Sequence, residues 1–288
     1  MLSTVLKQEL EHYLKQDLGK KDVTTALVIE KNCISKIKAN ENCVVAGIEE
    51  INYLFKSRKL KIKTHVKDGA IVKKNEKIIT IQGSNKKILT LERICLNVLG
   101  RMSGVATITK KAVQKSKTKI ALTRKTVPGF QLFDKKAGAI AGALTHRKNL
   151  EEMILLKENH LLFFDDIRTA IKKAKKTRKK VEVETENEKQ SLLASEENPN
   201  IIMLDNFSPK NAKETIKKLR KKGFSGQIEL SGGITLKNIS KYSNAGADFI
   251  SMGELTKKAR IIDFSLDVKK WNKNWKEDCL LADSNHTT

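Results

Sequence analysis

Three short clusters of cationic side chains stand out between residues 122 and 160. They are Arg124 and Lys125 in LTRKTVPGFQL, His146 and Arg147 in THRKN, and Lys157 in LLKENH. Each cluster lies at the edge of an apolar or small-residue run, which is typical of groups held at strand ends and directed at a ligand. Arginine binds carboxylate or phosphate through a planar fork, and lysine provides a point charge. A pocket that gathers these side chains would suit a small ligand with several negative charges, whereas ordinary surface cations of a basic protein are the alternative.

Carboxylates and glycines end several apolar runs later in the chain: Glu184, Asp205-Asn206, Ser231-Gly232-Gly233 and Gly253. The pair Glu184 and Asp205 can hold Mg²⁺, which takes oxygen ligands and substrate phosphates. The glycines suit a phosphate group, because backbone N–H groups approach closely where no side chain intervenes. Each has a structural alternative, such as a lysine partner for Glu182 or Glu184, or a helix cap at Asp205-Asn206. The whole set nevertheless predicts one site.

Alternating strands and helices must position these groups. From residue 119 to residue 257, strand-like runs such as VEVETE and NIIMLDN alternate with helical runs such as SPKNAKETIKKLRKKG. Six or seven such units in a row imply a parallel sheet, either doubly wound or closed as a barrel. In a β/α barrel the active site lies at the carboxyl ends of the strands, where the groups above are found.

The first part of the chain has a different texture. Residues 1–16 fit an amphipathic helix, residues 26–48 and 59–83 alternate as strands, and a helix is expected over residues 49–57. A long helix should follow from Lys87, with a break around Ser103-Gly104. This part therefore predicts a compact layer of mixed strands and helices.

The charge of the chain bears on its partners. Its 288 residues include 57 lysine and arginine against 33 aspartate and glutamate residues, a formal net charge of +24. Such an excess raises nucleic acids as partners. The charge is spread along the whole chain, however, without the interleaved aromatic residues of a base-stacking surface. The pattern favours solubility and steering of anionic substrates over nucleic-acid binding.

The sequence also bears on the compartment. It has no run of about 18 apolar residues that would predict a transmembrane helix. Its N-terminus, MLSTVLKQELEHYLKQ, is charged throughout and lacks the features of a signal peptide. The cysteines lack metal-ligand spacing, so we expect free thiols in a cytoplasmic protein; they are Cys33, Cys43, Cys95 and Cys279.

A family resemblance joins these observations. The runs TRKTVPGFQ, THR, LLKENH, VEVE, IIMLDNFSP, ELSGGITLKNI and DFISMGELT resemble, in order and spacing, those of quinolinate phosphoribosyltransferase, or nicotinate-nucleotide pyrophosphorylase (carboxylating). The runs DLGKKDVTT, VVAGIEE, DGAIV and LERICLNVLGRMSGVAT match as well, so the resemblance covers roughly residues 5–268. It implies an N-terminal α/β sandwich domain over residues 1–94 and an incomplete TIM-like α/β barrel over residues 95–266. Residues 267–288 would pack near the first domain or form a tail.

The resemblance also implies an activity: transfer of phosphoribosyl from phosphoribosyl pyrophosphate (PRPP) to quinolinate with Mg²⁺. The products are nicotinate mononucleotide, pyrophosphate and CO₂, in NAD biosynthesis. It implies a homodimer in which each N-terminal domain covers the partner's barrel. Quinolinate would contact Arg93 of the partner subunit and, within one chain, Arg124, Lys125, His146, Arg147 and Lys157. PRPP would contact Lys125, Glu184, Asp205, Ser231, Gly232, Gly233 and Gly253. The implied catalytic residues are Lys125, Lys157, Glu184 and Asp205, and the implied Mg²⁺ ligands are Glu184 and Asp205.

One departure from the family pattern and two alternatives accompany this interpretation. The family has a glycine-rich run before its His-Arg pair, where this chain has Ala141-Gly142-Ala143-Leu144-Thr145, a change that we treat as tolerated. The first alternative is a related, molybdenum-transport-associated phosphoribosyltransferase-like protein, against which Lys157 argues. The second is a basic nucleic-acid-binding protein on an inactive barrel, against which the intact cations and carboxylates argue.

Overall fold

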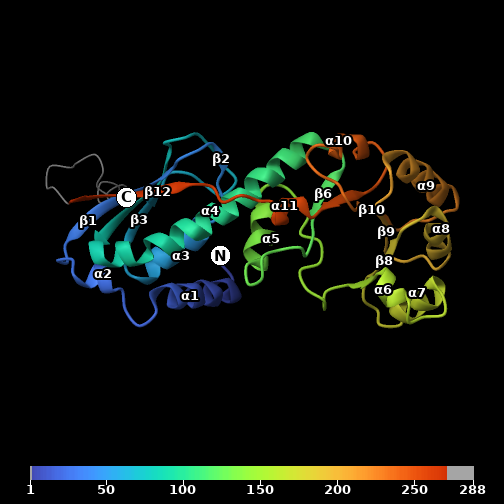
Figure 1. Ribbon diagram of the computed structural model, residues 1–288, viewed down its shortest axis with the longest axis horizontal. Helices are drawn as coiled ribbons and strands as arrows, with labels where there is room; N and C mark the ends of the chain where they lie inside the picture. The colour runs from blue at the N-terminus through green and yellow to red at the C-terminus, as the bar shows by residue number, and fades with distance from the viewer. Residues whose placement is uncertain (1, 271–288) are drawn as a thin grey trace, which may run out of the picture. The chain divides into compact units, whose positions relative to one another are not determined.

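The computed structural model describes residues 2–270, which form two compact units (Figure 1). The first unit comprises residues 2–107 and 260–270, and the second comprises Ile108–Ala259. The divisions therefore fall at 107/108 and 259/260, whereas the sequence placed domain boundaries at 94/95 and 266/267. The reason is that helix α4 (Asn85–Lys115) is continuous, so no change in local texture marks the division.

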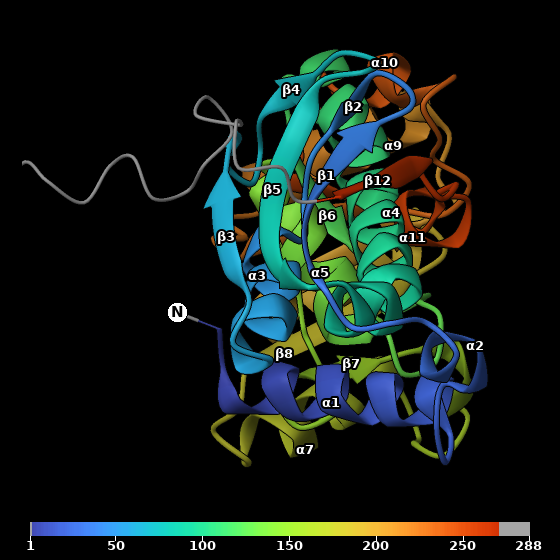
Figure 2. The ribbon, with the colours of Figure 1, turned by 90° about the vertical axis from the view of Figure 1, so that its left-hand side faces the viewer.

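The first unit is built on an antiparallel sheet with strand order β12-β1-β5-β3. Helix α1 packs along α3 (Figure 2), and Arg58 joins Glu11 of α1 in an ion pair of 2.7 Å. Besides α4, the described elements of this unit are α1 (Thr4–Leu18), α2 (Val23–Ala26), β1 (Asn32–Ala39), β2 (Cys43–Val44), α3 (Ile48–Ser57), β3 (Lys61–Thr64), β4 (Ile71–Val72), β5 (Lys77–Ser84) and β12 (Phe264–Lys270).

The end of the described chain returns to this sheet. Strand β12 pairs with β1 in antiparallel register, from Ala39 opposite Phe264 to Cys33 opposite Lys270. Residues 267–270 of the expected C-terminal segment are thus part of the sheet, and residues 271–288 lie outside the described residues. The expectation for Cys279 also falls outside them, while Cys33, Cys43 and Cys95 are free thiols as expected, and all three are buried.

Helix α4 has no break at Ser103-Gly104, so that prediction was wrong. The Ser103 hydroxyl accepts a hydrogen bond from the Ala46 N–H at 3.1 Å and donates one to the Ala46 carbonyl at 3.2 Å. A Cβ at Gly104 would collide with the carbonyl oxygen of Arg260. These two residues therefore serve close packing of other segments against the helix rather than its termination.

The second unit is built on a six-stranded sheet with strand order β6-β11-β10-β9-β8-β7, and all of its pairings are parallel. This confirms the predicted succession of β/α units. The described elements are β6 (Lys119–Leu122), α5 (Gln131–Ile140), β7 (Ile154–Leu156), α6 (Glu158–Leu161), α7 (Ile167–Lys175), β8 (Val181–Thr185), α8 (Glu188–Glu196), β9 (Ile201–Asp205), α9 (Pro209–Lys221), β10 (Gln227–Ser231), α10 (Ile239–Tyr242), β11 (Phe249–Met252) and α11 (Glu254–Lys257).

Helices α7, α8 and α9 lie side by side along one face of this sheet (Figure 1). Polar side chains cap the amino ends of α7 and α9. Asp166 accepts a hydrogen bond from the Thr169 N–H, and Ser208, just before Pro209, accepts one from the Asn211 N–H. Among the described residues, no helix is long and apolar enough to cross a membrane.

The two faces of the sheet have different chemistry, because successive strand residues point to opposite sides. The face beneath the helices is apolar, formed by residues such as Val183, Leu204 and Leu230. The alternate residues form the other face. They begin with an apolar layer of Ala121, Ile201 and Phe249 with Met153, and become polar toward the carboxyl ends of the strands.

Candidate active site

A cavity of about 320 Å³ lies at the carboxyl ends of these strands. Its wall brings together most of the predicted site residues: Arg124, Lys125, His146, Arg147, Lys157, Glu184, Asp205 and Ser231. All of its lining residues belong to the second unit, between Leu122 and Ser251. Side chains far apart in the sequence meet here because parallel strands end at one edge of the sheet.

The carboxylates occupy the face of the sheet that the helices leave open. Glu184 lies opposite Met203 in the register of β8 and β9, and Asp205 lies opposite Ser231 in the register of β9 and β10. Glu184 contacts the Lys157 ammonium group, and the Asn206 amide donates a hydrogen bond to Asp205 at 2.6 Å. Of the two glutamates for which a lysine partner was considered, Glu184 is the one that pairs, and its partner is Lys157.

Arg124 and Lys125 leave β6 as exposed side chains, and local hydrogen bonds fix their backbone. The Thr123 hydroxyl accepts a hydrogen bond from the Lys125 N–H at 3.1 Å, and the Thr256 hydroxyl donates one to the Lys125 carbonyl at 2.7 Å. The site therefore presents exposed cationic groups on a hydrogen-bonded backbone, which suits electrostatic binding of an anion.

His146 lies deeper than the other cations. Its Nε2 atom is 3.0 Å from a carboxylate oxygen of Glu229 and 3.1 Å from one of Glu182, and both glutamates are buried. Burial would lower the pKa of His146, but the two glutamates outweigh burial and raise its pKa to about 9. Burial, followed by the charge of Glu229, raises the pKa of Glu182 to about 7.

Sequence reasoning missed two residues near the site. Glu229 lies two positions before Ser231 on the same strand face, so the alternation of β10 could have revealed it. Lys135 is buried on α5, and its ammonium group donates hydrogen bonds to the carbonyls of Leu122, at 3.3 Å, and Thr145. Desolvation lowers the pKa of Lys135 to about 8. Lys135 therefore links the end of β6 to the loop that carries His146.

The predicted glycines differ in their surroundings. Gly232, with φ +83°, leaves no room for a Cβ beside Asn206, whereas Gly233, with φ +60°, has open space around its Cα. A Cβ on Gly253 would lie 3.0 Å from the side chain of Lys125. None of the three is part of the cavity lining, although Gly232 directly follows the lining residue Ser231.

The departure from the family's glycine-rich run has a simple geometry. Gly142 has φ +100°, so glycine remains where the turn after α5 requires a left-handed backbone. Ala141 and Ala143, with negative φ values in the turn, are buried. The chain then reaches His146, which itself has φ +51°.

Arg93 is an exposed residue of α4 in the first unit. The cavity described above is lined entirely by residues of the second unit. The place of Arg93 in the site therefore stays a prediction about the assembled enzyme.

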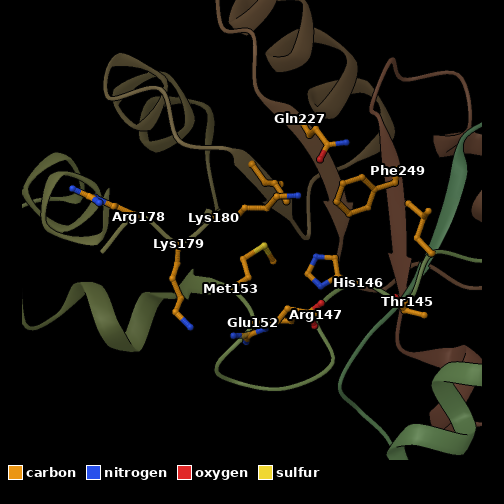
Figure 3. Close-up of a pocket in the computed structure, with 12 residues that line it drawn as sticks. Thr145, His146, Arg147, Glu152, Met153, Arg178, Lys179, Lys180, Gln227 and Phe249 are labelled. Carbon is orange, nitrogen blue, oxygen red and sulfur yellow. The ribbon is translucent and has the colours of Figure 1, made fainter. Parts of the chain in front are cut away.

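A second cavity, of about 610 Å³, shares His146 and Arg147 with the first (Figure 3). Its residues include Lys180, Gln227 and Phe249, which precede or begin strands β8, β10 and β11, so it lies at the amino ends of the strands. The rings of His146 and Phe249 are 5.7 Å apart between centroids. His146 therefore belongs to the wall of both cavities.

Residues 105–267 match the family "Quinolinate phosphoribosyl transferase, C-terminal domain", and residues 22–103 match the corresponding N-terminal domain. A relative from Methanocaldococcus jannaschii, named "Probable nicotinate-nucleotide pyrophosphorylase [carboxylating]", is 39% identical over 281 residues, covering 93% of this chain and 97% of the relative. A rat protein of the same name without "Probable" is 33% identical over 231 residues, covering 77% of each chain.

Solved structures agree. The nicotinate-nucleotide pyrophosphorylase from Francisella tularensis aligns with a TM-score of 0.87 and 32% identity, over 93% of this chain and 98% of that one. The enzyme of the same name from Ehrlichia chaffeensis aligns with a TM-score of 0.87 and 31% identity, over 93% of this chain and 99% of that one. The two family domains, in this order and over nearly the whole described chain, leave one assignment: the chain belongs to the quinolinate phosphoribosyltransferase family.

Proposed function

We propose that the protein transfers the phosphoribosyl group of PRPP to quinolinate and releases CO₂, giving nicotinate mononucleotide and pyrophosphate for NAD biosynthesis. The single observation that carries this proposal is the cavity in which Arg124, Arg147 and Lys157 face the carboxylates Glu184 and Asp205. Cations suit a dicarboxylate and a pyrophosphate, and carboxylates suit ribose hydroxyl groups and a metal ion. Family membership and the names of the relatives support the same reaction.

Quinolinate carries two adjacent carboxylates, and we assign them to the cationic part of the cavity. Arg124 and Arg147 provide guanidinium forks, and Lys125, His146 and Lys157 add charge around them. We also assign a role to Arg93 of the partner subunit, in a homodimer whose N-terminal domain covers the partner's barrel. The net charge of +24 would draw both anionic substrates toward the enzyme.

We assign PRPP to the opposite part of the cavity. Its ribose would meet Glu184 and Asp205, and its 5-phosphate would meet Ser231, Gly232, Gly233 and Gly253, where open space at Gly233 admits a phosphate close to the backbone. The oxygen donors Glu184 and Asp205, on neighbouring strands of one wall, fit Mg²⁺. When bound, Mg²⁺ would neutralise charge on the pyrophosphate.

The chain's own groups account for the remaining chemistry. Lys125 and Lys157 stabilise negative charge that develops on pyrophosphate as its bond to ribose C1 breaks. The arginines orient quinolinate so that its ring nitrogen attacks C1, which gains positive character in the transition state. The ring nitrogen becomes cationic and stabilises the electron pair that stays at ring C2 when the bond to the 2-carboxylate breaks and CO₂ leaves. A proton from solvent then adds at C2 and completes nicotinate mononucleotide. Covalent attack by a protein side chain is not required.

For the second unit we propose the incomplete TIM-like barrel that the family resemblance implies. The helix-free face of the sheet is layered as in a barrel interior, with Ala121, Ile201 and Phe249 in one layer and carboxylates above it. A parallel bridge between Ala121 and Leu144 adds a further segment beside β6, the edge strand. We place the enzyme in the cytoplasm, in line with the free thiols of Cys33, Cys43 and Cys95.

Direct assay tests this proposal. The protein is incubated with quinolinate, PRPP and Mg²⁺, and nicotinate mononucleotide is measured; nicotinate replaces quinolinate in a parallel reaction. We expect product from quinolinate and little from nicotinate, which lacks the 2-carboxylate that leaves as CO₂. Failure with quinolinate, or equal turnover of the two acids, would contradict the assignment.

A further inference from the structure

Two buried glutamates meet one nitrogen atom at the wall of the cavity, of which His146 and Glu229 are lining residues. Glu182 on β8 and Glu229 on β10 are 0% and 1% exposed, and each places a carboxylate oxygen within 3.1 Å of His146 Nε2. Strand β9 lies between their strands, and both side chains project from the helix-free face. The contact therefore joins distant strands of the sheet through the imidazole ring.

This burial of charge needs a reason. A buried carboxylate without a donor costs several kcal/mol, so an enzyme core keeps one only where it is compensated. Among the residues that the structure describes, one oxygen of Glu229 has His146 as its hydrogen-bond partner, whereas the other oxygen of Glu229 and both oxygens of Glu182 have none. His146 Nε2 lies 3.1 Å from one of the Glu182 oxygens, as an ion-pair contact. The imidazole ring is thus the cationic group that contacts both glutamates, and the charge of Arg147 acts on them as well.

Because His146 directly precedes Arg147, its contact with the glutamates can fix the position of Arg147. His146 has the left-handed φ of +51°, and the carbonyl of the preceding Thr145 is held by the buried Lys135. The following residue, Arg147, lines the cavity. Because the loop is held at Thr145 and at the imidazole ring, the position of the Arg147 Cα is restricted.

We propose that Glu182 and Glu229 are positioning residues for the quinolinate end of the cavity: they hold His146, and through it Arg147, in the binding geometry. The inference rests on the proposed function, because it names the substrate that these residues serve. Glu182 and Glu229 act through His146 and need not touch the substrate. The raised pKa of His146 agrees with this arrangement, because two carboxylates favour a protonated ring.

A bound cation is the competing account of the same cluster. One ligand atom from each of His146, Glu182 and Glu229 falls within 4.8 Å of the others, which is a spacing that a divalent ion could bridge. A metal ion would take the place of the proton between the ring and the glutamates. Metal analysis of the purified protein separates the two accounts: a stoichiometric ion that Glu229→Ala removes would overturn the proposal.

Steady-state kinetics test the positioning role. In Glu229→Ala we expect the KM for quinolinate to rise about tenfold to a hundredfold, while the KM for PRPP stays within about twofold. Glu229→Gln keeps the length and the acceptor oxygen and should restore most of the affinity. Glu229→Asp keeps the charge but withdraws the oxygen by one methylene, so it should resemble Glu229→Ala and remains informative if Glu229→Ala fails to fold. The same series at Glu182 should behave alike.

Glu188→Gln is the matched control, because Glu188 is a carboxylate of the same unit that pairs with Lys218 on the surface. It should leave both KM values unchanged. Equal rises in the KM for quinolinate and for PRPP in the Glu229 series would indicate a general structural defect and overturn the proposal. So would a folded Glu229→Ala protein with an unchanged KM for quinolinate.

A spectroscopic measurement tests the contact of His146 with the two glutamates independently of turnover. The Nε2–H proton of His146 should give a slowly exchanging NMR signal, assigned by its loss in His146→Gln and absent from Glu229→Ala. A wild-type protein without turnover would contradict the proposed function. The Nε2–H signal would still show whether His146 contacts Glu229. An Nε2–H signal that persists unchanged in Glu229→Ala would overturn the proposed contact.

Discussion

At the scale of single residues, the cationic side chains divide into two kinds. Arg124 and Lys125 are exposed at the end of β6 and free to meet a ligand, whereas His146 is held by buried glutamates. The residue types in the sequence predict the first kind, because cations beside apolar runs mark strand ends. They do not predict the second, because Glu182 and Glu229 come close to His146 only when β8 and β10 are part of one sheet.

Removal of one guanidinium group should separate activity from folding. We expect Arg124→Ala to lower turnover at least about a hundredfold, because the substrate carboxylate loses its fork. The thermal unfolding midpoint should stay close to that of the wild type, because Arg124 is exposed. Turnover and circular dichroism melting measure the two effects, with Lys210→Ala on α9 as control. Wild-type turnover in Arg124→Ala would show that the pocket is misplaced.

The ionisation of His146 predicts how stability depends on pH. Its pKa of about 9 in the folded protein exceeds the ordinary value of 6.5, so its stabilising contribution is complete below 6.5 and is lost as pH rises through 9. The contribution is at most about 3 kcal/mol. The lowered pKa of Lys135 adds stability over part of the same range, but it does so in every variant compared. The free energy of unfolding of the wild type, and of the exposed control His12→Gln, should therefore fall relative to that of His146→Gln between about pH 7 and about pH 10. Identical slopes in all three would refute the prediction.

At the scale of elements, the periodicity of the sequence predicted the β/α succession. It failed where tertiary packing overrides local preference. Ser103-Gly104 looks like a helix break, yet α4 continues because Arg260 packs where a side chain would be. The extension of the first sheet by β12 also depends on contacts distant in sequence, which no local pattern encodes.

Lys135 offers a test of how α5 supports the site. Lys135→Met leaves the carbonyls of Leu122 and Thr145 without this donor, and should lower the free energy of unfolding by about 1–3 kcal/mol. It should also raise the KM for quinolinate, because both carbonyls belong to segments that carry cationic site residues. Denaturant unfolding and steady-state kinetics measure these effects, and Lys210→Met serves as control. If Lys135→Met had the wild-type free energy of unfolding and an unchanged KM for quinolinate, Lys135 would not support the site.

At the scale of the whole molecule, the cavity of one chain supplies cations and carboxylates from the second unit alone. Arg93 of the partner subunit would complete it in the proposed homodimer. The sequence can suggest this only through family resemblance, since nothing local to α4 distinguishes an arginine that serves another subunit from a solvated one.

Complementation between two inactive variants tests that assembly. Arg93→Ala and Arg124→Ala should each be inactive, but co-expression should form mixed dimers in which one site has both arginines. With random assembly about a quarter of the wild-type activity should return. Co-expression of the Arg93→Ala, Arg124→Ala double variant with Arg124→Ala is the control and should remain inactive. Absence of complementation in dimers of verified mixed composition would place Arg93 within its own subunit's site or outside any site.

The proposed reaction joins quinolinate to phosphoribose in this cavity, with loss of one carboxylate. Its most direct test is the stoichiometry of the reaction with quinolinate labelled at the 2-carboxylate, with PRPP and Mg²⁺ present. We predict that nicotinate mononucleotide, pyrophosphate and labelled CO₂ form in equal amounts. Consumption of PRPP without labelled CO₂, or no nicotinate mononucleotide at all, would contradict the account.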